Sequence, residues 1–247
     1  MTRVLFYRTT ERLLIISIVF FFIISFASGL YGTEKEFDKL DIKLKTASPE
    51  EKLKLLLDFP YFKDDTASQR SLLYIREAVR LAKETGTPGQ LCKSLNIKGI
   101  WYYLNSRFKE AVQCYRSALD LEPRLSDKRQ VANVMTNFGI VYRDLKDYET
   151  AEYYLTRALN IRKRAGGDVV RLAHNLNSLG LTLHTKKQPT RALSHFREAL
   201  AIFNKHRVKW GIAAALNNIA EVYHYSFHEY STAFDYYRKA LPVFEEI

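Results

Sequence analysis

The chain has 247 residues, of which 47% are hydrophobic and 13% aromatic, while only 10 are glycine and 6 are proline. This composition excludes a disordered or low-complexity chain and favours helices over strands. The formal net charge of +11 would suit acidic peptides, anionic membranes or nucleic acid as partners. Basic clusters such as Arg162, Lys163 and Arg164 also lie where helices should end and would complement the helix dipole there, so charge alone does not select a partner.

The first 32 residues differ in kind from the rest of the chain. Three arginines precede residues 13–26, which are apolar except for two serines, and Ala27, Ser28 and Gly29 follow. This order predicts that 1–32 is a signal peptide. An uncleaved membrane anchor is the alternative, because extending the apolar run gives about 19 residues, close to the roughly 20 that cross a bilayer. Both readings predict an exported, periplasmic or extracytoplasmic protein.

Residues 33–90 predict helices that carry a weaker version of the later pattern. A leading helix is expected at 33–47, where charged and apolar residues alternate around one apolar stripe. A degenerate helix pair is expected at 48–90. Ser48 followed by Pro49 reads as an N-cap with proline in the first turn, and the Gly-Thr-Pro-Gly sequence at 86–89 ends the pair.

Residues 91–247 contain a pattern of small and aromatic residues that recurs at about 40 residues. Repetition at this period indicates stacked two-helix units rather than one globular core. A glycine inside a helix costs about 1 kcal/mol relative to alanine, so recurring glycines need a packing reason, namely close contact between helices. The recurring small residues are Gly99, Gly139, Gly180 and Ala220, then Ala111, Ala151, Ala192 and Ala233, then Ala118, Ala158, Ala199 and Ala240, with the aromatics Tyr102, Tyr142 and Tyr223 in the first helices.

These residues resemble the tetratricopeptide repeat (TPR) family, in the longer-period form that is similar to kinesin light chains and bacterial signalling proteins. The resemblance implies an all-α fold: a right-handed superhelical solenoid of antiparallel helix pairs, with about five units of which the first is degenerate and four clear repeats cover 91–247. Some positions depart from the motif. Leu183 replaces an aromatic, Lys163 and Asn204 stand where proline is expected, and one extra residue lies between Tyr223 and Tyr230.

The resemblance also implies that asparagines near the small residue line the concave face and hydrogen-bond the backbone of an extended peptide. An amide suits this role because it is both donor and acceptor. Hydrogen bonding to neighbouring helices is the alternative, and Asn137 sits one place later than its counterparts, which predicts an imperfectly aligned row. Arg143 and His184 are expected on the same face, where Arg143 could pair with an acidic group. The asparagines are Asn96, Asn137, Asn177, Asn217 and Asn218.

The motifs of common hydrolases, kinases and zinc enzymes are absent from the sequence, so we expect no catalytic residue, no metal and no cofactor. The predicted function is a non-enzymatic scaffold, exported or membrane-tethered, that binds a protein or peptide ligand, with an acidic ligand as one candidate. The alternative is a sensory or regulatory input module of a signal-transduction system, shortened and lacking its output module. Membrane contact is expected through 1–32 if that segment is uncleaved, and no nucleic acid is expected because export would oppose it.

Overall fold

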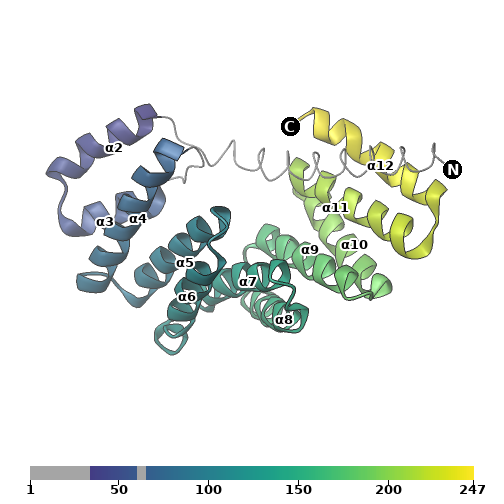
Figure 1. Ribbon diagram of the computed structural model, residues 1–247, viewed down its shortest axis with the longest axis horizontal. Coiled ribbons are helices and arrows are strands. Elements are labelled where there is room, and N and C mark those ends of the chain that lie inside the picture. The colour runs from purple at the N-terminus through teal and green to yellow at the C-terminus, as the bar shows by residue number, and fades with distance from the viewer. Residues whose placement is uncertain (1–33, 60–64) are drawn as a thin grey trace.

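A computed structural model describes residues 34–59 and 65–247, and the predicted segment 1–32 lies outside them. The described residues form helix after helix, without a strand, and the helices stack along an arch (Figure 1). The predicted all-α helical-repeat solenoid is therefore confirmed. The helices are α2 (Glu34–Thr46), α3 (Pro49–Asp58), α4 (Asp65–Glu84), α5 (Pro88–Leu104), α6 (Phe108–Leu119), α7 (Lys128–Asp144), α8 (Tyr148–Ala165), α9 (Val169–Thr185), α10 (Pro189–Lys205), α11 (Lys209–Val222) and α12 (Tyr230–Glu245), with a 3-10 turn at Glu122–Arg124 and a π-helical turn at Tyr223–Phe227.

Helices α3, α5, α7, α8 and α9 begin at side chains that accept a hydrogen bond from a backbone N–H group of the first turn. Ser48 Oγ accepts a hydrogen bond from Glu51 N at the start of α3, with Pro49 in the first turn. Thr87 caps α5 in a reciprocal bond with Gln90. Aspartate side chains accept a backbone N–H at the starts of α7, α8 and α9, namely Asp127, Asp147 and Asp168. Because these caps stabilise helix starts by about 1 kcal/mol each, the boundaries follow from local sequence.

At the recurring glycines the two helices of a pair lie so close together that there is no room for a side chain. A Cβ added at Gly99 would lie 2.5 Å from the Tyr115 ring, and one added at Gly180 would lie 2.6 Å from the Phe196 ring. Close contact thus explains the recurrence of glycine in mid-helix. The second helices present small residues that are all buried: Ala111, Ala118, Ala151, Ala158, Ala192, Ala199, Ala233 and Ala240.

Departures from the repeat motif have local structural consequences. The extra residue of the last repeat is accommodated by a π-helical turn at Tyr223–Phe227, which ends at His228 in the left-handed conformation. Pro123 lies in the 3-10 turn after α6, whereas α8 and α10 continue through Lys163 and Asn204, where proline is absent. These helices are therefore 18 and 17 residues long, against 12 for α6.

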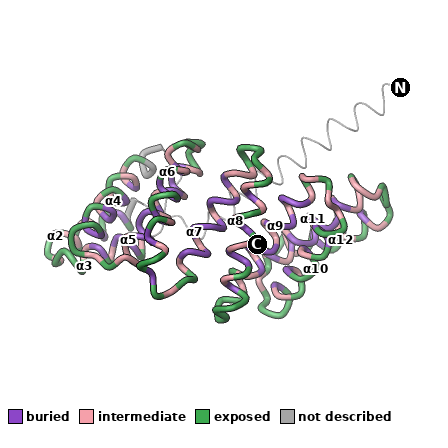
Figure 2. The backbone as a smooth tube through the Cα atoms, turned by 90° about the horizontal axis from the view of Figure 1, so that it is seen from below, coloured by how far each residue is buried: buried purple, intermediate pink, exposed green. Residues whose placement is uncertain are grey.

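The core runs between the helices along the whole arch. Figure 2 shows buried positions alternating with exposed ones along each helix, as amphipathic packing requires. Buried aromatic rings fill the junctions, with Phe138 contacting both Tyr142 and Tyr154 at centroid distances of 4.7 Å. Two apolar clusters share helix α8, because Ala158 belongs to the amino-terminal cluster and Leu155 to the carboxyl-terminal one. The second repeat thus joins the two halves of the solenoid.

Within the part of the chain that the structure describes, no helix combines the length and hydropathy needed to cross a bilayer.

Candidate functional site

Helices α5, α7, α9 and α11 lie toward the hollow side of the arch, and α6, α8, α10 and α12 lie outside them (Figure 1). The four helices on the hollow side are called the inner row below. All five predicted asparagines belong to it: Asn96 on α5, Asn137 on α7, Asn177 on α9, and Asn217 with Asn218 on α11. The fold therefore brings residues that are up to 122 positions apart in sequence onto one row of helices.

Four of these asparagines hydrogen-bond to one another in pairs. Asn137 Nδ2 donates to Asn96 Oδ1 at 3.0 Å, and Asn218 Nδ2 donates to Asn177 Oδ1 at 2.9 Å. Each pair joins neighbouring repeats across 41 residues, so the one-place offset of Asn137 relative to the recurring small residue does not prevent its contact with Asn96. Asn218, rather than Asn217, is the partner of Asn177.

Asn217 has a different environment. Its Nδ2 donates to Glu221 Oε1 at 2.9 Å, within the same helix. Burial raises the pKa of Glu221 above its ordinary value, and the hydrogen bond from Asn217 only partly offsets that effect. Asn217 is thus occupied by its own helix and stands apart from the two asparagine pairs.

Arg143 and His184 also have partners within the protein. The Arg143 guanidinium forms an ion pair with Asp144 at 2.9 Å, and Asp144 additionally accepts a hydrogen bond from Tyr103 Oη at 2.7 Å. The His184 ring lies 3.1 Å from Ser226 Oγ, across the third and fourth repeats. An acidic ligand at Arg143 would therefore compete with an existing ion pair.

The basic cluster Arg162, Lys163 and Arg164 lies in the last turn of α8, as expected, but Arg162 is buried there. Only 7% of Arg162 is exposed, and its Nη2 donates to Asn133 Oδ1 at 2.8 Å. Burial lowers the pKa of this guanidinium to about 10, still far above neutral pH, so the group carries its charge. The sequence held one signal: the equivalent residues of the next two repeats are Phe203 and Phe244.

Near Arg162, on the inner row, His174 stacks on Trp210 at a centroid distance of 4.0 Å. Burial, together with the charges of Arg171 and Arg162, lowers the pKa of His174 to about 4. The imidazole is therefore neutral at physiological pH, and the positive charge in this region belongs to the arginines.

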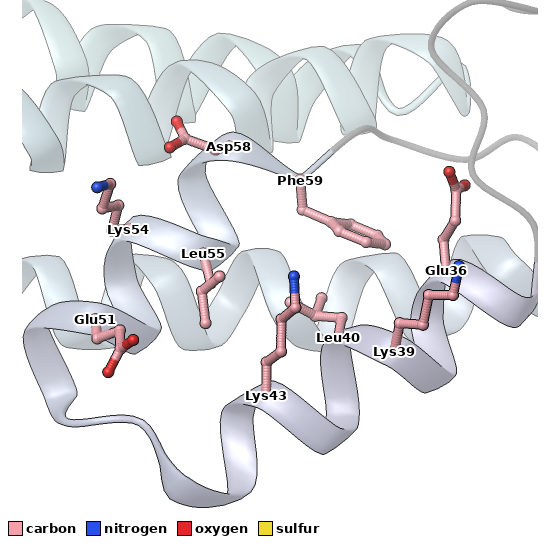
Figure 3. Close-up of a pocket in the computed structure, with 9 residues that line it drawn as sticks. All are labelled: Glu36, Lys39, Leu40, Lys43, Glu51, Lys54, Leu55, Asp58 and Phe59. Carbon is pink, nitrogen blue, oxygen red and sulfur yellow. The ribbon is translucent and has the colours of Figure 1, made fainter.

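A separate pocket of about 450 Å³ lies between α2 and α3 (Figure 3). Leu40, Leu55 and Phe59 form its apolar part. Lysines and acids surround them, with Lys43 and Lys54 among the labelled side chains in Figure 3. The pocket belongs to the amino-terminal end of the arch and includes none of the predicted asparagines.

Among residues 34–59 and 65–247, no group of three or more histidine, cysteine, aspartate or glutamate side chains is placed to hold a metal ion.

The repeats of this chain match a known family. Two family models described as tetratricopeptide repeat match it, over residues 130–205 and 212–247. No curated protein sequence matches it.

Several solved structures share its fold at low sequence identity. BtubC (BKLC) from P. vanneervenii is 19% identical with a TM-score of 0.63, over 86% of this chain and 91% of that one. Putative kinesin light chain TPR-like repeats from Podosopora anserina are 13% identical with a TM-score of 0.60, over 81% and 98%. Aspartyl phosphate phosphatase F from Bacillus subtilis is 16% identical with a TM-score of 0.65, over 84% of this chain but only 55% of that one. Given the repeated helix pairs and both family matches, the chain belongs to the tetratricopeptide repeat family.

Proposed function

We propose that the protein is a non-enzymatic scaffold that binds an extended peptide segment of another protein along the inner row. The observation that carries the proposal is the pair of asparagine contacts, Asn96 with Asn137 and Asn177 with Asn218, on the hollow side of the arch. An extended peptide presents backbone N–H and C=O groups, and amide side chains can bind both without requiring a particular ligand side chain.

The hydrogen bond within each pair leaves capacity for a ligand. An amide has two N–H donors and a carbonyl oxygen that can accept two hydrogen bonds. Because Asn96 and Asn177 act as acceptors in their pairs, both N–H groups of each remain for a peptide carbonyl. The pairing also fixes the side chains before binding, which reduces the entropy that a ligand must overcome.

Aspartate at Asn96 and Asn177 tests the proposal, because a carboxylate still accepts from Asn137 and Asn218 but has no N–H group. The doubly substituted protein (N96D/N177D) should bind N-acetylated, C-amidated nonapeptides from a random library more weakly than the wild type. Loss of hydrogen bonds worth about 1 to 3 kcal/mol in total predicts a reduction of roughly 5- to 150-fold.

The matched control is Asn204→Asp, which makes the same substitution at an exposed position on α10, outside the inner row. Binding by this variant should equal that of the wild type. Equal affinities for the wild type and the double variant, with unchanged helicity by circular dichroism, would contradict the role of the asparagines.

A regulatory module of a signal-transduction system is the second candidate. It is supported by the likeness in fold to aspartyl phosphate phosphatase F. The matched region covers only 55% of that phosphatase, so the likeness is to one part of a longer protein. Crosslinking in native cells, followed by identification of the bound proteins and measurement of their affinity for the purified chain, distinguishes the two. Direct binding to a sensor kinase would favour regulation, whereas binding to envelope assembly factors would favour a scaffold.

We further propose that the protein is exported, with residues 1–32 as a cleaved signal peptide rather than a membrane anchor. The support is the order of arginines, apolar run and small residues in that segment. Cell fractionation with amino-terminal sequencing tests this: a mature chain beginning near residue 30, outside the cytoplasm, is expected. A full-length cytosolic product would overturn export, and a full-length membrane-bound product would favour the anchor.

A further inference from the structure

Arg162 introduces a positive charge at a repeat position that the two following repeats fill with phenylalanine and the preceding repeat with Glu122. Its counterpart in the next repeat, Phe203, is 1% exposed and packs against Trp210 at a centroid distance of 5.4 Å. Phe244 follows at the same step of 41 residues. Since the fold accepts phenylalanine here, packing alone does not account for an arginine.

Among the residues that the structure describes, no acid forms an ion pair with Arg162. Its Nη2 donates to Asn133, which is neutral, and its Nε is enclosed without a hydrogen-bond partner. The nearby carboxylate belongs to Asp168, but Arg171 already binds that group, with Nε 2.7 Å from Oδ2 and its backbone N 3.0 Å from Oδ1. Two arginines and one aspartate leave this cluster with one uncompensated positive charge.

Asp127, at the start of α7, does not balance the charge of Arg162 either. Asp127 is paired with Arg129, whose Nε lies 2.8 Å from Asp127 Oδ1. A hollow of about 470 Å³ lies beside this pair and is lined also by Lys128 and by Ala165, one turn after Arg162 on α8. The cations around the hollow outnumber the acids, which favours the approach of an anionic group.

The position of Asn133 connects Arg162 to the inner row. Asn133 lies four residues before Asn137 on α7, so both asparagines occupy the same face of that helix. A ligand that contacts Asn137 therefore passes within about one helical turn of the residue that holds the Arg162 guanidinium. Arg143 differs, because its ion pair with Asp144 already provides an acidic partner.

We infer that Arg162, oriented by Asn133, binds a carboxylate of the peptide ligand and thereby makes the inner row selective for an acidic segment. The carboxylate is that of an aspartate or glutamate side chain or of a free carboxyl terminus. It would balance the uncompensated charge, and guanidinium groups bind carboxylates through paired N–H···O bonds. This inference rests on the proposed function, whose peptide-binding row it extends.

The test compares the full-length wild type with two variants of α8. Arg162→Met removes the buried charge and places an apolar side chain where Phe203 and Phe244 stand in the later repeats. Arg164→Met is the matched control, because it removes the same charge from an exposed position two residues away. Helicity measured by circular dichroism verifies folding. Arg162→Gln is a second variant, which retains an N–H donor for Asn133 if methionine disturbs packing.

Two nonapeptide libraries are the probes, one with amidated and one with free carboxyl termini. The wild type and Arg164→Met should select aspartate or glutamate at a fixed position, or the free terminus. Which library shows selection identifies the source of the carboxylate. Arg162→Met and Arg162→Gln should lose about 10- to 100-fold of that preference while still binding neutral peptides, as expected for one charge-assisted hydrogen-bonded contact.

An acid preference that persists in both Arg162 variants overturns the inference, as does a wild type that binds peptides without any acid preference. In either case binding through the asparagines would stand, and it would fail separately if N96D/N177D bound normally. A folded wild type that binds no peptide from either library would overturn both proposals.

Discussion

Replacing Gly180 with alanine should destabilise the protein, although helix propensity alone predicts the opposite. Alanine in the middle of a helix is favoured over glycine by about 1 kcal/mol. In α9, however, the new methyl carbon would lie 2.6 Å from Phe196 Cε1 and 2.7 Å from Cδ1. Phe196 is fully buried, so its ring cannot move aside into solvent. Overpacking of this kind costs about 1 to 3 kcal/mol, and subtracting the propensity gain of about 1 kcal/mol leaves a net loss of up to about 2 kcal/mol.

The contact with Phe196 can be tested by a double-mutant cycle in urea, followed by far-ultraviolet circular dichroism. In a Phe196→Ala background the space for the methyl group is open, and Gly180→Ala should then stabilise by up to about 1 kcal/mol. The effect of the substitution would thus change sign, with a coupling free energy of about 1 to 3 kcal/mol, equal to the overpacking cost.

Gly89→Ala is the control, because a methyl carbon there would meet only the flexible Gln130 amide at 3.0 Å. The free energy of unfolding of the Gly89→Ala variant should rise or stay unchanged. If Gly180→Ala raised the unfolding midpoint in the wild-type background, close contact between the helices would no longer explain the recurring glycine.

The remaining predictions concern polar groups. Arg162→Met should leave the urea midpoint of unfolding unchanged or raise it, because replacing a buried charge by an apolar side chain is often neutral or stabilising by about 1 to 4 kcal/mol. A clearly lower midpoint would contradict the conclusion that the charge of Arg162 lacks an acidic partner. The lowered pKa of His174, about 4, means that stability is complete above pH 6.5 and falls by about 3 kcal/mol as the pH drops from 6.5 to 4, because the unfolded state takes up the proton first. His174→Gln should flatten that dependence, and an unchanged pH profile would refute the assignment. Single and double alanine substitutions of Asn96 and Asn137 should give a coupling free energy of about 0.5 to 1.5 kcal/mol, and additive effects would speak against their hydrogen bond.

Much of the fold could be predicted because its determinants are local or periodic. Ser48 and Pro49 act within one helical turn, where an N-cap satisfies neighbouring N–H groups. The glycines and alanines recur at the period of the helix pair, so their spacing reports which surfaces meet. The sequence showed that the last repeat has one extra residue before Tyr230. It did not predict that a π-helical turn would take up that residue.

The partners of the polar side chains could not be predicted in the same way. Two asparagines, Asn217 and Asn218, lie 40 and 41 residues after Asn177, and either could be its hydrogen-bond partner by spacing. Only the packing of α9 against α11 selects Asn218. Likewise, the sequence placed Arg162 at a helix end, but its burial beside Asn133 could not be predicted.

The sequence by itself determined the repeat, its period and the family, because these depend on short-range spacing of small, aromatic and capping residues. Only the tertiary structure decided which amides pair across repeats and which arginine lacks an acid, because hydrogen bonds and charge balance depend on distances between helices that are far apart in sequence. The asparagines were thus candidate binding residues from the sequence, whereas their pairing, and Arg162 as a candidate binding group, came from the tertiary structure.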